Sequence, residues 1–138
     1  NVYGPRQIST AYGFVVGIFI NQVMQGKNPT IFGDGMQTRD FVYIKDNVQT
    51  TLAAMQSHST DGEVVNVGTG RPVTILQLAE AVIKLSGKNL KQAFLPQREG
   101  DIKHRYPSID KMKKLINYEC TYTLQQGLKE TYSWFARQ

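Results

Sequence analysis

The chain has 138 residues, with 16 Lys and Arg against 11 Asp and Glu, which gives a formal net charge of +5. This length suits one folded unit that buries roughly 70% of its unfolded surface without disulfides or metals. The hydrophobic fraction of 41% and the charged fraction of 20% exclude a disordered, collagen-like or coiled-coil chain.

The cysteines, histidines and apolar runs exclude further classes of protein. Cys120 is the only cysteine, and His58 and His104 are the only histidines, so we expect no internal disulfide and no structural zinc. The longest apolar run, residues 14–20, is far shorter than the roughly 20 residues that cross a bilayer. We therefore expect a cytoplasmic protein with no membrane partner.

The excess of basic residues does not favour nucleic acid as a partner. Lys111, Lys113 and Lys114 cluster without stacking aromatic residues beside them, and no recognition-helix or RNA-binding motif is present. Solvated helix faces explain such clusters, so we expect no nucleic acid binding.

The first third of the chain predicts short strands around one apolar helix. Residues 1–5 read as a strand that runs into a loop at a Gly-Pro pair. Residues 14–25 are apolar on nearly all sides and stop at a glycine, which predicts a helix covered by several partners. Residues 30–32 and 39–43 are rich in β-branched and aromatic side chains, and we expect two strands joined by a glycine-rich turn.

The middle of the chain predicts a helix and a further strand. Asp46 is expected to cap a helix that runs to about residue 57. The spacing of three apolar residues predicts the buried face of that helix: Val48, Leu52 and Met55. The apolar run within residues 63–68, bounded by turn residues, predicts a central strand.

Two capping boxes predict the best-defined helices of the second half. Thr74 with Gln77 starts one of them, and Thr123 with Gln126 starts the other. A short strand is expected over residues 92–95, before a proline. The whole chain therefore reads as one α/β unit of mixed short strands and helices.

A glycine-rich turn places the first group of candidate binding residues. Arg39 follows residues 33–37, and its planar guanidinium can donate to two phosphate oxygens at once. Phe32, at the end of the preceding strand, can lie against a base. The alternative is that Arg39 pairs with Asp34 or Asp40 at the surface and that Phe32 belongs to the core.

A second candidate segment, residues 96–101, holds an arginine and a carboxylate three residues apart. Arg98 can donate to a diphosphate, and Asp101 can accept hydrogen bonds from two vicinal hydroxyls, such as those of a ribose. The alternative is a solvated loop with both signs of charge, because surface ion pairs are common and weak.

Other motifs give weaker signals. Gly68-Thr69-Gly70 lacks the third glycine of a dinucleotide fingerprint because Val73 occupies that position, so we interpret it as a tight connection. No tyrosine is followed four residues later by lysine, and no G-x-S-x-G motif occurs. The chain has binding groups without an obvious reacting group.

Taken in order, four segments resemble the C-terminal part of the NAD-dependent nucleotide-sugar epimerases and dehydratases. These extended short-chain dehydrogenases, with the UDP-glucose 4-epimerases as the nearest type, are matched over residues 1–7, 31–43, 66–70 and 96–101. The resemblance implies the C-terminal substrate-binding portion of an extended Rossmann-type fold, over residues 1–138. It also implies that residues 1–5 and 63–68 are strands that complete a Rossmann sheet lying outside this sequence.

The resemblance implies roles for eight residues in binding the nucleotide sugar. They are Asn1 at the sugar, Phe32 at the uracil, Arg39 and Arg98 at the diphosphate, Asp101 at the ribose hydroxyls, Ile75 along the nucleotide pocket, and Val15 and Val16 at the start of a helix near the diphosphate.

The family's catalytic Tyr-x-x-x-Lys and its main NAD-binding glycine motif are expected upstream of Asn1. The resemblance then implies that this chain binds UDP and positions the sugar for NAD-dependent C4 epimerisation, and that it is inactive alone. A 4,6-dehydratase, a UDP-glucuronate decarboxylase and a non-catalytic nucleotide-sugar binding module stay open as alternatives. A homodimeric full-length protein and a role in cell-surface polysaccharide biosynthesis are further expectations.

Overall fold

The computed structural model describes residues 1–8 and 14–138. Its helices and strands follow one another in this order: β1 (Val2–Tyr3), α1 (Val15–Met24), β2 (Thr30–Phe32), β3 (Thr38–Arg39), β4 (Val42–Tyr43), α2 (Ile44–Met55), the 3-10 helix η1 (His58–Thr60), β5 (Val73–Thr74), α3 (Ile75–Ser86), β6 (Ala93–Leu95), β7 (His104–Arg105), α4 (Asp110–Leu115) and α5 (Leu124–Phe135).

The strands form three small sheets, most of whose pairings join distant parts of the chain. β1 pairs in parallel with β4, and β2 pairs in parallel with β6. In the third sheet β3 lies between β5, which is antiparallel to it, and β7, which is parallel. The strand expected over residues 30–32 is β2, but the one expected over residues 39–43 is divided into β3 and β4, and these three strands belong to three different sheets. The mixed α/β class predicted from the sequence is confirmed.

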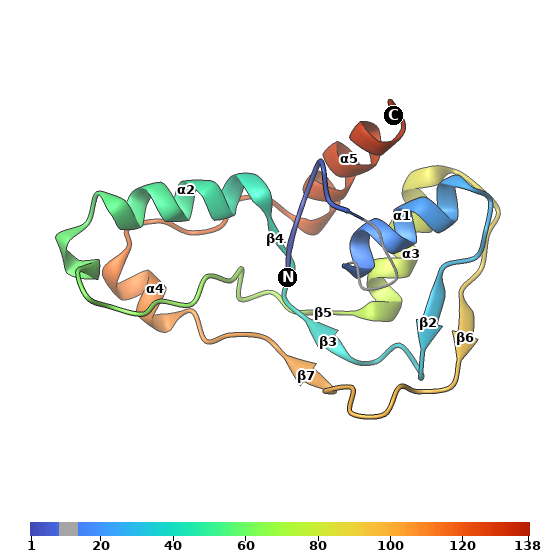
Figure 1. Cartoon of the computed structure of the whole chain (residues 1–138), viewed down its shortest axis with the longest axis horizontal. Coiled ribbons are helices and arrows are strands. Elements are labelled where there is room, and N and C mark those ends of the chain that lie inside the picture. The colour runs from blue at the N-terminus through green and yellow to red at the C-terminus, as the bar shows by residue number, and fades with distance from the viewer. Residues whose placement is uncertain (9–13) are drawn as a thin grey trace.

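The hydrophobic core is formed by side chains of three helices, α1, α3 and α5, and of the strands β1, β2 and β4. α1 and α3 lie side by side next to β2 and β6, whereas α2 and α4 lie at the opposite end of the molecule (Figure 1). Both α1 and α3 also contact α5. The fully buried side chains of this core include Phe19, Ile20, Val23, Leu78, Val82 and Leu128. In the described part of the chain, no helix is both long and apolar enough to cross a membrane.

Both capping boxes predicted from the sequence are present. Thr74 accepts a hydrogen bond from the Gln77 amide at 3.0 Å, and the Gln77 side chain accepts one from the Thr74 amide at 2.9 Å. Thr123 and Gln126 form the same pair of bonds at the start of α5. Such caps satisfy amides that the first turn of a helix leaves without partners, so they fix where α3 and α5 begin.

The predicted role of Asp46 as a helix cap is wrong. α2 begins at Ile44, and Asp46 is fully buried inside its first turn. Its carboxylate accepts hydrogen bonds from the Tyr118 hydroxyl at 2.8 Å and from the amides of Thr121 and Tyr122, each at 3.0 Å. A buried carboxylate needs such donors, and this one holds the segment before α5 against α2.

The predicted buried face of α2 is also wrong. Val48 and Leu52 are each 45% exposed and Met55 is 79% exposed, while Asp46 and Thr50 are the buried residues of this helix. The apolar stripe exists in the sequence, but no element of the described chain covers it. We call Val48, Leu52 and Met55 the α2 apolar face.

The strand expected over residues 63–68 is not formed. This segment makes no strand pairing with the described residues, and Val64 is 84% exposed. A strand needs a neighbour to take its backbone hydrogen bonds, and none lies beside this segment. By contrast, β1 finds a parallel partner in β4 within the chain.

Candidate functional site

One cavity of about 510 Å³ collects residues from three of the four matched segments, 1–7, 31–43 and 96–101, and none from residues 66–70. The start of the chain, the beginning of α1, the ends of β2 and β3, the first residue of α3 and the loop before β7 all contribute to its walls. Seven of the eight predicted site residues line it: Asn1, Val15, Phe32, Arg39, Ile75, Arg98 and Asp101. The eighth, Val16, is 1% exposed and packs in the core instead. Adjacent helical residues point in different directions, which separates Val16 from Val15.

Arg39 and Asp101 form an ion pair across the cavity wall. The Nη2 atom of Arg39 lies 2.7 Å from Oδ1 of Asp101, and the side chains are 14% and 24% exposed. Arg39 also donates from Nη1 to the carbonyl of Thr38 at 2.8 Å. The surface pairing with Asp34 or Asp40 is therefore not formed, and the guanidinium is held at the cavity by two fixed acceptors.

Arg98 stands over the ring of Phe32. Its guanidinium carbon lies 3.8 Å from the ring centroid, a close cation–π contact. Phe32 is half-buried, and Arg98 is exposed. The aromatic ring and both predicted diphosphate arginines therefore face a single space.

Asp40 is the residue next to Arg39, yet it serves a different region. It is 3% exposed and accepts hydrogen bonds from the amides of Thr69 and Gly70, at 2.8 and 3.0 Å, and from the Thr69 hydroxyl. Successive residues of an extended chain point to opposite sides, so Arg39 reaches the cavity while Asp40 reaches the glycine turn. The amides of that turn, which resembles a phosphate cradle, are already bound to a carboxylate.

The glycine turn also has no room for larger residues. A Cβ atom built on Gly68 would lie 2.8 Å from Oδ2 of Asp40 and 2.9 Å from side-chain atoms of Ile109 and Pro107. The tight connection predicted for Gly68-Thr69-Gly70 is thus present, and its glycine allows Asp40 to approach the backbone.

Comparison with known proteins shows what these motifs share with others. The model of the NAD dependent epimerase/dehydratase family matches residues 1–68. A UDP-N-acetyl-alpha-D-glucosaminuronate decarboxylase from Bacillus cytotoxicus is 33% identical over 98% of this chain and 44% of its own length. The structure of a Thermotoga maritima UDP-glucose 4-epimerase with UDP-glucose matches 99% of this chain and 44% of its own, with 36% identity and a TM-score of 0.91. The chain belongs to the NAD-dependent epimerase/dehydratase family.

A second solved member of the family shows the cofactor. The Bacillus cereus UDP-glucuronic acid 4-epimerase in complex with UDP-glucuronic acid and NAD is 36% identical, with a TM-score of 0.89, over 99% of this chain and 43% of its own. The family depends on NAD. The chain spans less than half the length of these epimerase/dehydratase family relatives and matches their C-terminal portion.

The described residues do not fit NAD as the family's glycine motif would hold it. A dinucleotide diphosphate needs free amides at a glycine turn, and the amides of Thr69 and Gly70 are taken by Asp40. That NAD is bound mainly by another part of the full-length protein stays a prediction.

The structure adds cavity residues that the sequence did not indicate. Gln37 donates from Nε2 to the Phe32 carbonyl at 2.8 Å and to Asp101 at 3.4 Å, so it braces both. Arg105 lines the same cavity because β7 pairs in parallel with β3, with Arg105 opposite Arg39. The sequence carries no signal for that pairing between two-residue strands.

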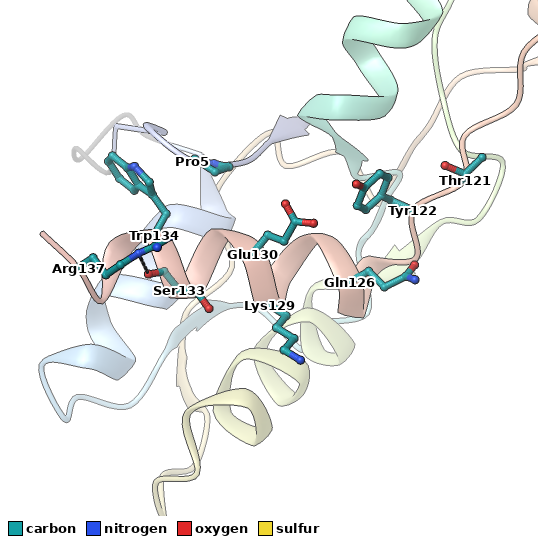
Figure 2. A pocket seen from close by; sticks show the side chains of 9 residues that line it. All are labelled: Pro5, Thr121, Tyr122, Gln126, Lys129, Glu130, Ser133, Trp134 and Arg137. Atoms are coloured by element: carbon teal, nitrogen blue, oxygen red, sulfur yellow. Dashed lines mark hydrogen bonds between the residues drawn. The ribbon is translucent and has the colours of Figure 1, made fainter.

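A larger cavity, of about 740 Å³, lies along α5 and holds none of the predicted site residues (Figure 2). Its carboxylate, Glu130, already accepts hydrogen bonds from the Tyr43 hydroxyl and from Lys45, each at 2.7 Å. Figure 2 shows Arg137 bonded back to Ser133, at 3.1 Å to the carbonyl. Two of the charged groups of this cavity, Glu130 and Arg137, are therefore already bonded within the protein.

The remaining reactive side chains are not arranged as catalytic groups. Burial raises the pKa of the Cys120 thiol to about 11, with the charges of Asp46 and Asp40 adding to it. His58 pairs with Asp61 at the surface, at 3.3 Å, and His104 shares a hydrogen bond with Thr38 at 2.9 Å. Among residues 1–8 and 14–138, no three side chains of His, Cys, Asp or Glu are grouped to hold a metal.

Proposed function

We propose that this chain binds the UDP part of a nucleotide sugar and positions the sugar for NAD-dependent C4 epimerisation carried out with a further domain. One observation carries the proposal: a single cavity brings together the two predicted diphosphate arginines, the Phe32 ring and the Asp101 carboxylate, from segments up to 69 residues apart. A nucleoside diphosphate needs this set of groups, since its phosphates, base and ribose diol each take a different partner.

The bonding of Arg39 supports its assignment to the diphosphate. A guanidinium carries five N–H donors, and the described contacts of Arg39 use one on Asp101 and one on the Thr38 carbonyl. The other donors are available to phosphate oxygens. Because the two existing bonds fix the plane of the group, little side-chain entropy is lost when it binds a ligand.

The carboxylate of Asp101 supports its assignment to the ribose. One oxygen accepts from Arg39 at 2.7 Å and the other accepts from Gln37 at the longer distance of 3.4 Å. A carboxylate has about four lone-pair sites, so Asp101 can keep the Arg39 bond and accept from two vicinal hydroxyls. Positioning the nucleotide in this way would fix where its sugar lies, which is the contribution of binding to catalysis.

Decarboxylation of a uronic acid sugar is the second candidate reaction. The Bacillus cytotoxicus relative is a decarboxylase, and the arginine cluster of the cavity is equally compatible with either reaction. Incubating the full-length protein with UDP-glucose and with UDP-glucuronate, and following the sugar signals by NMR, separates a C4 epimer from a product that has lost CO₂.

We also propose that residues 1–5 and 63–68 join a Rossmann sheet formed by another part of the full-length protein. The unpaired backbone of residues 63–68 and the exposed α2 apolar face support this, because both need a partner that the described residues do not supply. The chain alone should then show no NAD-linked turnover. Measured epimerisation by the purified 138-residue chain would contradict this, and light scattering tests the proposed homodimer of the full-length protein.

Thermal protection by UDP tests the binding function. We expect UDP to raise the melting temperature of the protein that carries these residues, and Arg39→Ala to remove most of the rise. A charged bidentate contact contributes about 1.5–3 kcal/mol, so the dissociation constant should increase roughly 10- to 150-fold. Arg137→Ala, which removes the same charge from the cavity along α5, should keep the protection. Equal UDP affinity in the wild type and in Arg39→Ala would overturn the proposal.

A further inference from the structure

The loop of residues 96–101 contacts the segment of β2 and β3 through two of its side chains, Asp101 and Arg98. Asp101 is held by the ion pair with Arg39 and by Gln37. Three residues earlier, the Arg98 guanidinium lies 3.8 Å from the centroid of the Phe32 ring. The Asp101 amide donates to the Arg98 carbonyl at 3.3 Å, so the loop turns back on itself and directs both side chains toward the same wall.

The Arg39–Asp101 ion pair and the Arg98–Phe32 contact differ in whether they can remain when a nucleotide binds. The ion pair between Arg39 and Asp101 can remain, because Arg39 keeps unused N–H donors and Asp101 keeps unused lone pairs for the ligand. The contact between Arg98 and Phe32 cannot remain. The guanidinium, 3.8 Å from the centroid of the Phe32 ring, and a base stacked on that ring face would fill the same space. Phe32 and Arg98 both line the cavity, so their contact lies at its wall.

Arg98 is also the member of the pair that is able to move. It is exposed, and among the described residues it forms no ion pair with a carboxylate and no side-chain hydrogen bond. Its contact with Phe32 is a single cation–π interaction, which is weak at an exposed site. A diphosphate offers the guanidinium two charged acceptors in exchange, a stronger contact than the ring.

We infer that Arg98 covers Phe32 in the free protein and that a nucleobase reaches the ring only when a phosphate group draws Arg98 away. The inference rests on the proposed binding of UDP and adds a selection rule to it. Arg98 weakens the binding of a nucleoside that lacks phosphates, because no new contact replaces the one with Phe32. It strengthens the binding of a nucleoside diphosphate. The same side chain therefore acts with opposite sign on the two ligands.

Uridine and UDP titrations of the protein that carries these residues test the rule. NMR chemical shifts give the millimolar dissociation constant of uridine, and titration calorimetry gives that of UDP. In Arg98→Ala we expect the dissociation constant of uridine to fall about 2- to 5-fold, the size of an exposed cation–π contact. The dissociation constant of UDP should rise about 10-fold or more, since a charged contact to the diphosphate is lost.

Two further variants isolate the contact with the ring. Lys103→Ala removes one positive charge two residues beyond Asp101 and does not line the cavity, so it should leave uridine binding unchanged. In a Phe32→Leu background, Arg98→Ala should no longer improve uridine binding, because no ring remains to be uncovered. Circular dichroism checks that each variant keeps its fold.

The outcomes separate this inference from the function on which it rests. If the wild type does not bind UDP, the proposed function fails, and the inference fails with it. If the wild type binds UDP but Arg98→Ala weakens uridine or leaves it unchanged, only the inference is overturned. An equal gain in uridine affinity with and without the Phe32 ring would also overturn it.

Discussion

Arg39 on β3 and Asp101 in the loop before β7 are joined by a contact of 2.7 Å between Nη2 and Oδ1, although 62 residues separate them in sequence. This ion pair links the two segments whose residue types most resemble a nucleotide site. It also means that each partner sets the position of the other before any ligand arrives.

Asp101→Asn should therefore act differently on ligands with and without a ribose. We expect UDP to bind more weakly, because the amide is a poorer acceptor for the ribose hydroxyls. Inorganic pyrophosphate should bind equally well or more tightly, since it has no ribose and a negative charge beside Arg39 is removed. Calorimetric titration with both ligands measures the two effects. Parallel losses for UDP and pyrophosphate would show that Asp101 serves only to hold Arg39.

Asp40→Ala should destabilise the fold. It leaves the amides of Thr69 and Gly70 without their acceptor in a partly buried turn, at a cost of about 2–4 kcal/mol in unfolding free energy. Urea denaturation measures the loss. Asp34→Ala is the matched control, because Asp34 is exposed and accepts only the Met36 amide at 2.9 Å, and its effect should be small.

The Cys120 thiol should react slowly near neutral pH. Its pKa is raised to about 11, chiefly by burial, so the thiolate at pH 7.5 is roughly 100-fold scarcer than for a thiol at the ordinary value of 9.0. The rate of alkylation by iodoacetamide should keep rising above pH 9 in the folded protein. In urea the rate should be half-maximal near pH 9, the ordinary pKa, and a half-maximal rate near pH 9 in the folded protein would contradict the raised pKa.

The α2 apolar face should contribute little to the stability of the 138-residue chain. Leu52→Gln is expected to change the unfolding free energy by about 0.5 kcal/mol or less, because the side chain is 45% exposed. Leu78→Ala, at a position with 0% exposure in α3, should cost about 2–5 kcal/mol. A large loss in Leu52→Gln would mean that the α2 apolar face is covered even in the isolated chain.

Gly127 in α5 should not tolerate alanine, although alanine normally favours helices. A Cβ atom at this position would collide with the Tyr3 hydroxyl and lie 2.8 Å from a ring carbon of Tyr43. We expect Gly127→Ala to destabilise the protein by about 1–3 kcal/mol, measured by thermal unfolding. Alanine at Gln125, an exposed position of the same helix, is the control and should be neutral.

The parts of the fold that the sequence predicts are those set by neighbouring residues. The capping boxes at Thr74 and Thr123 and the apolar helix over residues 14–25 need only local information, and all three are confirmed. Arginine, aspartate and phenylalanine beside glycine turns are typical of phosphate and base binding, and the structure places the residues selected on this ground along one cavity.

The parts that it does not predict depend on distant partners. The pairing that brings Arg105 opposite Arg39 joins strands of two residues, which are too short for any pattern. The role of Asp46 depends on where residues 118–122 lie. Residues 63–68 have the apolar composition of a strand. A strand also requires a neighbouring strand to pair with, and composition does not show whether one is present.

Arg39 and Asp40 are adjacent in sequence, yet we expect ligand binding to constrain the first and fold stability to constrain the second. One side chain faces the cavity and the other is bonded to the glycine turn. A variant library sorted once for cellular abundance and once for retention on immobilised UDP should separate them. Most substitutions of Asp40 would be lost in the first sort, and most substitutions of Arg39 would survive it and be lost in the second.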